Sequence, residues 1–276
     1  MSWEVYLLLI IAGALGGFVS GLVGIGGGVI YVFVIPYALQ YWNIPHEWQV
    51  QFIIANSLAA IFFGSIAANF THFKKGYFYI RPVLAIGFAA TLSSWLSLKF
   101  FVNTVYFSKE LFLFFLILLM AYMLVYTLIG ATKNTDEAVD EIPFAGLLLV
   151  GLTSGLVASA SGLGGGIVVI PMLNRFFGIN IKKASAISLG VITIASFFIT
   201  CTNTTVELTA FHVSGSLGLI IPAICLTLSL SVLFTSPWGV LMAHRLPSRF
   251  ISYIYATILL LVIVFEMKAL FDLMIT

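Results

Sequence analysis

Two glycine-rich stretches decide the fold: residues 20–30 read SGLVGIGGGVI, and residues 154–168 read SGLVASASGLGGGIV. Each stretch lies inside a long apolar segment, where a cluster of glycines disfavours a continuous helix. Helices broken at corresponding places in the two halves of a membrane protein are typical of a transporter's binding site. The sequence therefore predicts two broken helices that meet at one site.

The composition is that of an integral membrane protein, whose surroundings are the lipid bilayer. Hydrophobic residues make up 61% of the 276 residues and charged residues only 8%, and the mean hydropathy is +1.14. A formal net charge of +2 gives no basic surface for nucleic acid. We expect no signal peptide at the N-terminus, because it carries Glu4 in place of a basic region. Cys201 and Cys225 form no metal or redox motif, so we expect no cofactor.

Hydropathy predicts an all-α polytopic fold. The apolar blocks are 3–42, 50–72, 79–102, 109–131, 143–174, 184–203, 213–237 and 249–272. As one straight helix the first block would be about 60 Å long, roughly twice the hydrocarbon thickness. We therefore expect this block to fold back at Gly24 to Gly28, and the fifth block to fold back at its own glycine cluster.

Two fold-backs give each half a glycine-broken helical hairpin plus three transmembrane helices. Five segments per half is an odd number, so the halves are expected to be inverted repeats. We assign 1–131 to the first repeat, 132–142 to a connecting loop and 143–276 to the second repeat. We align residues 20–23 with 154–157, which makes Ala158 to Ser161 an insertion of four residues.

The distribution of cations supports the fold-backs. With them, nine of the twelve Lys and Arg residues fall on one side, at loops 73–81, 131–142, 174–183 and 244–249. Without them the same twelve cations would split five to seven. The positive-inside rule favours the uneven arrangement, which makes both termini external.

The glycine clusters have the chemistry of an anion site. Glycine lets a ligand approach the backbone, and the start of a broken helix presents free N–H groups together with the positive end of the helix dipole. No Asp or Glu falls clearly mid-span, which leaves such a pocket neutral to electropositive. Nearby hydroxyl and amide groups can add donors. The candidate substrate-binding residues are Ser20, Gly24, Gly26, Gly27, Gly28, Asn56, Ser57, Ser159, Ser161, Gly162, Gly164, Gly165, Gly166, Ser188 and Asn203.

These residues also have simpler explanations. Glycines allow transmembrane helices to pack closely, and a serine hydroxyl in a helix often bonds its own backbone. His72 ends the second block beside Lys74 and Lys75, where we interpret it as an interfacial residue or as part of a gate at the cytoplasmic mouth.

The duplicated glycine cluster, the Ser-Leu pair in the following helix and the Lys-Lys-Gly shortly after His72 resemble the TauE/SafE sulfite exporter family, also called the toluene sulfonate uptake permeases. A proline follows each cluster, Pro36 and Pro171, although at different distances. The resemblance covers nearly the whole chain. It implies a secondary transporter of sulfite, organosulfonates or related carboxylate anions in the plasma membrane.

The hypothesis from sequence is therefore a small-anion transporter that works by alternating access. Coupling to a proton or another ion stays open, as do the direction of transport and the oligomeric state. An anion channel with the same pocket is the first alternative. A membrane-embedded enzyme is the second, but the sequence has no HExxH, GxSxG or clustered Cys and His to support it.

Overall fold

The computed structural model describes residues 1–102, 142–207 and 213–275, with scattered positions between 114 and 128. The regular elements in these ranges are helices, which confirms the all-α fold. They are α1 (Trp3–Val23), α2 (Gly28–Leu39), η1 (Gln40–Trp42), α3 (His46–Lys74), α4 (Ile80–Ser97), η2 (Leu98–Val102), α6 (Phe144–Ser161), α7 (Gly166–Phe176), α8 (Ile181–Thr204), α9 (Pro222–Arg245) and α10 (Ser248–Ile275).

Seven helices in the described part of the chain are long and apolar enough to cross a membrane. α2 and α7 are shorter, with 12 and 11 residues. Each follows a long helix after a glycine turn, so both expected hairpins are present. The expected span at 109–131 lies mostly outside the described residues, as does the connecting loop 132–142, although the described positions from 114 to 128 are helical.

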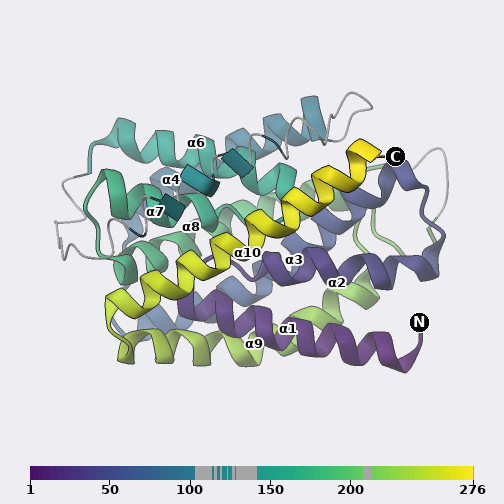
Figure 1. The fold of residues 1–276 in the computed structure, drawn as a ribbon, viewed down its shortest axis with the longest axis horizontal. Helices are drawn as coiled ribbons and strands as arrows, with labels where there is room; N and C mark the ends of the chain where they lie inside the picture. The colour runs from purple at the N-terminus through teal and green to yellow at the C-terminus, as the bar shows by residue number, and fades with distance from the viewer. Residues whose placement is uncertain are drawn as a thin grey trace.

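Helices of one half of the chain pack against helices of the other half (Figure 1). α1 of the first half packs along α9 of the second, and α6 of the second half packs along α4 of the first. Between these two flanking pairs, α3 and α8 contact each other, and α3 also contacts α9 just as α8 contacts α4. α1 begins and α10 ends at the same end of the molecule (Figure 1).

Small residues let the flanking pairs approach closely. Gly13, Gly17 and Gly21 lie four residues apart on α1, on the face towards α9. A Cβ atom on Gly17 would lie 2.9 Å from the Val232 Cα atom, and a Cβ atom on Gly155 of α6 would lie 2.2 Å from the Ala90 carbonyl oxygen. For these glycines the packing interpretation is the one that holds.

The block expected at 213–237 was wrong at both ends, because its helix, α9, runs from Pro222 to Arg245. The preceding residues form a loop in which Leu217 and Ile220 pair through their backbones. This loop is only partly buried, because Ser214, Gly215 and Leu217 are exposed. Its apolar residues, such as Val213 and those at 219–221, extended the hydropathic block beyond the helix. Pro222 marks the true start, since proline suits the first turn of a helix.

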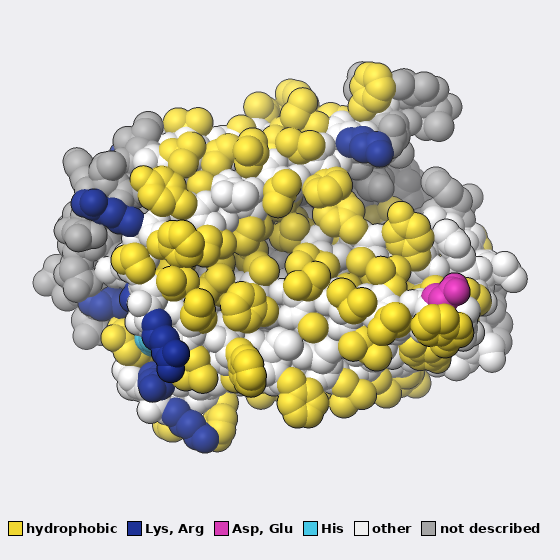
Figure 2. Space-filling model, turned by 60° about the horizontal axis from the view of Figure 1, so that its bottom comes forward, with side chains coloured by type: hydrophobic (Ala, Val, Ile, Leu, Met, Phe, Trp, Pro, Cys, Tyr) yellow, Lys and Arg dark blue, Asp and Glu magenta, His cyan; other side chains and the backbone are white. Residues whose placement is uncertain are grey.

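Most basic side chains on the face seen in Figure 2 gather at one end, and hydrophobic side chains cover much of the rest. At that end, contacts bring several helix ends together: the His72 and His244 rings meet, Lys182 Nζ donates to the His244 carbonyl, and Ser248 Oγ donates to Asn180 Oδ1. We call this the basic end. Its cations are Lys74, Lys75, Arg81, Arg175, Lys182, Lys183, Arg245 and Arg249.

Candidate functional site

Both glycine clusters form the same kind of turn. Gly24 ends α1 with φ 90°, and its N–H donates to the Ser20 carbonyl at 2.7 Å. Gly162 ends α6 with φ 71°, and its N–H donates to the Ala158 carbonyl at 3.1 Å. This left-handed conformation at a helix end strongly favours glycine. Positive φ angles recur at Gly26, Gly27, Gly164 and Gly165.

The expected four-residue insertion is wrong. α6 continues without interruption through residues 158–161, and the two turns begin at Gly24 and Gly162. With 138 positions between equivalent residues, Gly17 matches Gly155 and Gly28 matches Gly166. Ser20 then matches Ala158 rather than Ser154. The alignment of the two SGLV stretches was therefore wrong. The equivalent helix packing of Gly17 and Gly155 and the equivalent turns at Gly24 and Gly162 fix the correct alignment of the halves.

The two turns meet. A Cβ atom on Gly28 would lie 2.6 Å from the Gly162 carbonyl oxygen, and a Cβ atom on Gly166 would lie 2.6 Å from the Gly24 carbonyl oxygen. No side chain fits between backbones that are this close. Glycine at the start of α2 and of α7 is therefore a requirement of the contact itself, quite apart from any ligand.

Two buried serines fasten the turns by matching hydrogen bonds. Ser57 Oγ of α3 donates to the Gly162 carbonyl at 2.7 Å, and Ser188 Oγ of α8 donates to the Gly24 carbonyl at 2.8 Å. In each case a hydroxyl from one half reaches the turn of the other half. Both serines are fully buried, so each bond also satisfies a carbonyl that has no access to water.

The starts of α2 and α7 lie at these turns without side-chain caps. Their N-cap residues, Gly27 and Gly165, provide no side chain to bond the first N–H groups. The backbone bonds to the N-cap carbonyls begin at the Ile30 N–H in α2 and at the Val168 N–H in α7, and the Gly166 N–H already donates to the Gly164 carbonyl. Uncapped N–H groups and the helix dipoles make both ends attractive to an anion.

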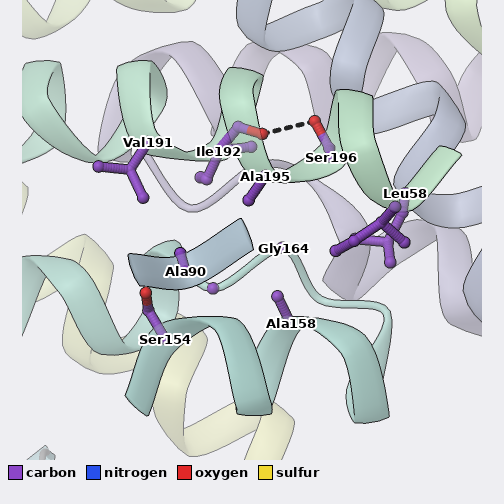
Figure 3. A pocket seen from close by; sticks show the side chains of 11 residues that line it. Leu58, Ala90, Ser154, Ala158, Gly164, Val191, Ile192, Ala195 and Ser196 are labelled. Atoms are coloured by element: carbon purple, nitrogen blue, oxygen red, sulfur yellow. Dashed lines mark hydrogen bonds between the residues drawn. The ribbon is translucent and has the colours of Figure 1, made fainter. Parts of the chain in front are cut away.

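A small cavity of about 10 Å³ lies beside the second turn (Figure 3). Its walls include Gly164 and Gly165 of the turn, Leu58 of α3, and Ile192 and Ser196 of α8. The Ser196 hydroxyl donates to the Ile192 carbonyl rather than into the cavity. The space suffices for about one water molecule, so the structure holds the turns in a closed arrangement.

The remaining polar residues that were predicted for the site are less central. Ser159 and Ser161 donate to carbonyls of their own helix, and Ser161 Oγ also accepts from the Leu163 N–H of the second turn at 3.2 Å. Asn56 donates to the Phe52 and Leu219 carbonyls and accepts from the Ile221 N–H, so its amide anchors the loop before α9. Ser20 is buried with an unpartnered hydroxyl. Asn203 lies 15 residues beyond Ser188 on α8, about 22 Å away along the helix.

The two central helices carry a repeated polar stripe that was not predicted from the sequence. Ser57, Ser65, Asn69 and His72 of α3 correspond, 131 positions later, to Ser188, Ser196, Thr200 and Asn203 of α8. These spacings keep each set within one face of its helix. Asn69 Nδ2 crosses to α8, where it donates to the Leu189 carbonyl at 2.9 Å and to Thr193 Oγ1 at 2.6 Å. Comparing the two halves at this spacing would have revealed the stripe.

Tyr31 was also missed. Its side chain is fully buried, and its hydroxyl has no hydrogen-bond partner. A Cβ atom on Gly27 would lie 2.7 Å from that hydroxyl, which places it at the start of α2. The equivalent position in the second half is Val169, so the two turns differ in this donor.

Comparisons with known proteins agree with this architecture. The family described as "Sulfite exporter TauE/SafE" matches residues 9–265. A probable membrane transporter protein of Methanocaldococcus jannaschii is 28% identical over 254 residues, covering 91% of each chain. A probable membrane transporter protein of Haemophilus influenzae is 27% identical over 268 residues, covering 93% of this chain and 96% of the relative.

Seven apolar helices and these relatives define the class: the protein is a multi-pass membrane transporter and not an enzyme. The chain belongs to the TauE/SafE sulfite exporter family, as its match over residues 9–265 shows. The family resemblance inferred from the duplicated glycine cluster is thereby confirmed.

Proposed function

We propose that the protein carries small anions, such as sulfite, organosulfonates or related carboxylates, between the N-terminal ends of α2 and α7. The observation that carries this proposal is the contact between the turns, each bonded by a serine of the opposite half. It brings two uncapped helix starts to one place. Anions are favoured at such ends by the free N–H groups and the dipole.

The closed contact fits a carrier better than an open pore. Only about 10 Å³ is free beside the second turn, so a sulfite-sized anion requires the hairpins to separate. We propose that separation towards one side and then the other gives alternating access. A channel, by contrast, would let anions flow only down their electrochemical gradient. Measuring whether anions accumulate against that gradient distinguishes a coupled carrier from a channel.

We further propose that residues 1–131 and 143–276 are inverted repeats joined by 132–142. The exchanged pairs α1–α9 and α4–α6 support this relation, because a two-fold axis between the halves would turn one pair into the other. The positive-inside rule then puts the basic end in the cytoplasm and both termini outside, in the plasma membrane.

Leucine substitutions in the turns test the proposal. Gly27→Leu and Gly165→Leu place large side chains where positive φ angles and close backbone neighbours exclude them. We expect each variant to reach the membrane but to lose sulfite and sulfonate flux in proteoliposomes. Gly215→Leu is the matched control, since Gly215 also has a positive φ but no atom within 4 Å of its added Cβ. Undiminished flux in both turn variants would refute a backbone role in binding.

A further inference from the structure

Two histidines, His72 buried and His244 half-buried, form a pair at the basic end. His72 lies in the last turn of α3 and is only 2% exposed, and His244 lies in the last turn of α9. Their ring centroids are 5.3 Å apart in an edge-to-face arrangement. Tyr77 packs on His244 with a centroid separation of 4.6 Å. The pair therefore joins helices from the two halves of the chain.

The ring nitrogens of this pair lack partners. Both nitrogens of His72 and Nε2 of His244 are buried and make no hydrogen bond. A neutral imidazole carries one N–H donor and one acceptor nitrogen, and leaving such groups buried and unpaired is costly. A structural histidine would normally bond a carbonyl or carboxylate. Three unsatisfied nitrogens in one cluster indicate a binding site for a polar ligand.

The charge around the pair is positive. Lys182 Nζ of α8 donates to the His244 carbonyl at 3.3 Å, and Lys75, just after α3, also acts on His244 electrostatically. Lys74 and Arg245 flank the two histidines along the chain. The carboxylates with described side chains lie elsewhere: Glu4 opens α1, Glu207 follows α8 and Glu266 lies late in α10. The positive potential at this site therefore favours a negatively charged ligand.

We propose that His72 and His244, with Lys182, bind a small oxyanion together with one proton at the basic end. An anion bound beside the two rings favours a protonated imidazole more than the empty site does. Binding the anion therefore takes a proton from solvent, and binding the proton strengthens anion binding by the same factor. The proton adds to an imidazole nitrogen, and no other bond forms or breaks.

This inference rests on the proposed function, because it makes the histidine pair a second binding site on the anion's path. The polar stripe of α3 runs from Ser57 at the turns to His72, about 22 Å along the helix. At the equivalent place on α8 stands Asn203, which cannot take up a proton. The two ends of the path then differ in one respect: the basic end has imidazoles that take up a proton when the anion binds, whereas the other end has Asn203.

Proton uptake on anion binding tests the proposal. Purified protein in nanodiscs is titrated with methanesulfonate or sulfate, whose charges stay constant between pH 5 and 8, in weak buffer with a pH indicator. The wild type should take up protons, and its anion affinity should weaken by up to about tenfold per pH unit as the pH rises. His72→Asn, which copies the α8 end, should abolish uptake and make the affinity independent of pH.

A second variant and a control complete the experiment. His244→Gln should reduce proton uptake as well, and it spares the bond from Lys182, which reaches the backbone carbonyl. Arg249→Gln removes an exposed charge at the same end and should retain uptake. Anion binding without proton uptake, or full uptake in His72→Asn, would overturn the histidine site and leave the turn site to be judged by the flux of Gly27→Leu. No anion binding by the wild type would overturn both.

Discussion

Ser57 and Ser188 are the residues that hold the two glycine turns together. Each reaches a carbonyl of the opposite half, at 2.7 and 2.8 Å respectively. Both carbonyls end a helix at a left-handed glycine, where no further helical N–H can satisfy them. The near-identical geometry implies that the two bonds contribute similar free energies.

Removing either hydroxyl should therefore destabilise the protein equally. Ser57→Ala and Ser188→Ala each leave a buried carbonyl unpaired, at a cost of about 1 kcal/mol. We expect the apparent melting temperature in detergent to fall by about 2–4 °C in each variant, as measured by fluorescence scanning. A variant that melts like the wild type would show that its bond does not form.

Glycine at position 28 is required by space rather than by backbone conformation. Gly28→Ala would bring a Cβ atom to 2.6 Å from the Gly162 carbonyl, so we expect a loss of about 1–3 kcal/mol. Gly166→Ala should behave in the same way, because its Cβ would meet the Gly24 carbonyl. The same melting assay checks both. Equal stability of Gly28→Ala and the wild type would mean that the turns are not in contact.

The packing of whole helices depends on which face carries the small residues. In α6, Gly155 faces α4 closely, whereas its neighbour Leu156 is exposed. An exposed leucine in such a helix faces lipid, which is as apolar as the side chain itself. The two neighbours therefore have opposite sensitivities to side-chain size.

Substitutions at Gly155 and Leu156 should show whether folding depends on close helix packing or on the hydrophobicity of α6. Gly155→Leu should prevent α6 from approaching α4 and greatly lower the yield of folded protein, measured by size-exclusion chromatography. Leu156→Ala removes a lipid-facing side chain and should leave the elution profile unchanged. Normal folding of Gly155→Leu would show that α6 does not pack closely against α4 at Gly155.

For the molecule as a whole, the sequence predicted the fold-backs but not how the halves interlock. Hydropathy and helix length suffice for the hairpins, since 40 apolar residues cannot cross once as a straight helix. Ser57 and Ser188 were recognised by type, but their acceptors lie 105 and 164 positions away in sequence, so only tertiary structure reveals them. The pairing of His72 with His244 was hidden for the same reason. The start of α9 was predicted wrongly because apolar residues in the loop before it raise the hydropathy as helical residues do.

The orientation of the whole molecule is open to a labelling test. In a variant without Cys201 and Cys225, Ser214→Cys and Arg249→Cys place thiols at exposed positions on opposite ends. The positive-inside rule predicts that a membrane-impermeant maleimide labels Ser214→Cys in intact cells and Arg249→Cys only after permeabilisation. The reverse pattern would mean that the basic end faces outwards.

Crystals grown with selenite, a heavier analogue of sulfite, would show whether the anion binds between the two glycine turns. Anomalous scattering at the selenium edge locates the anion without reference to any assumed site. We expect a peak between residues 26–28 and 164–166, with the turns moved apart from their present contact. A protein that binds selenite while these turns stay packed together, with no anomalous density between them, would contradict a binding site between the turns.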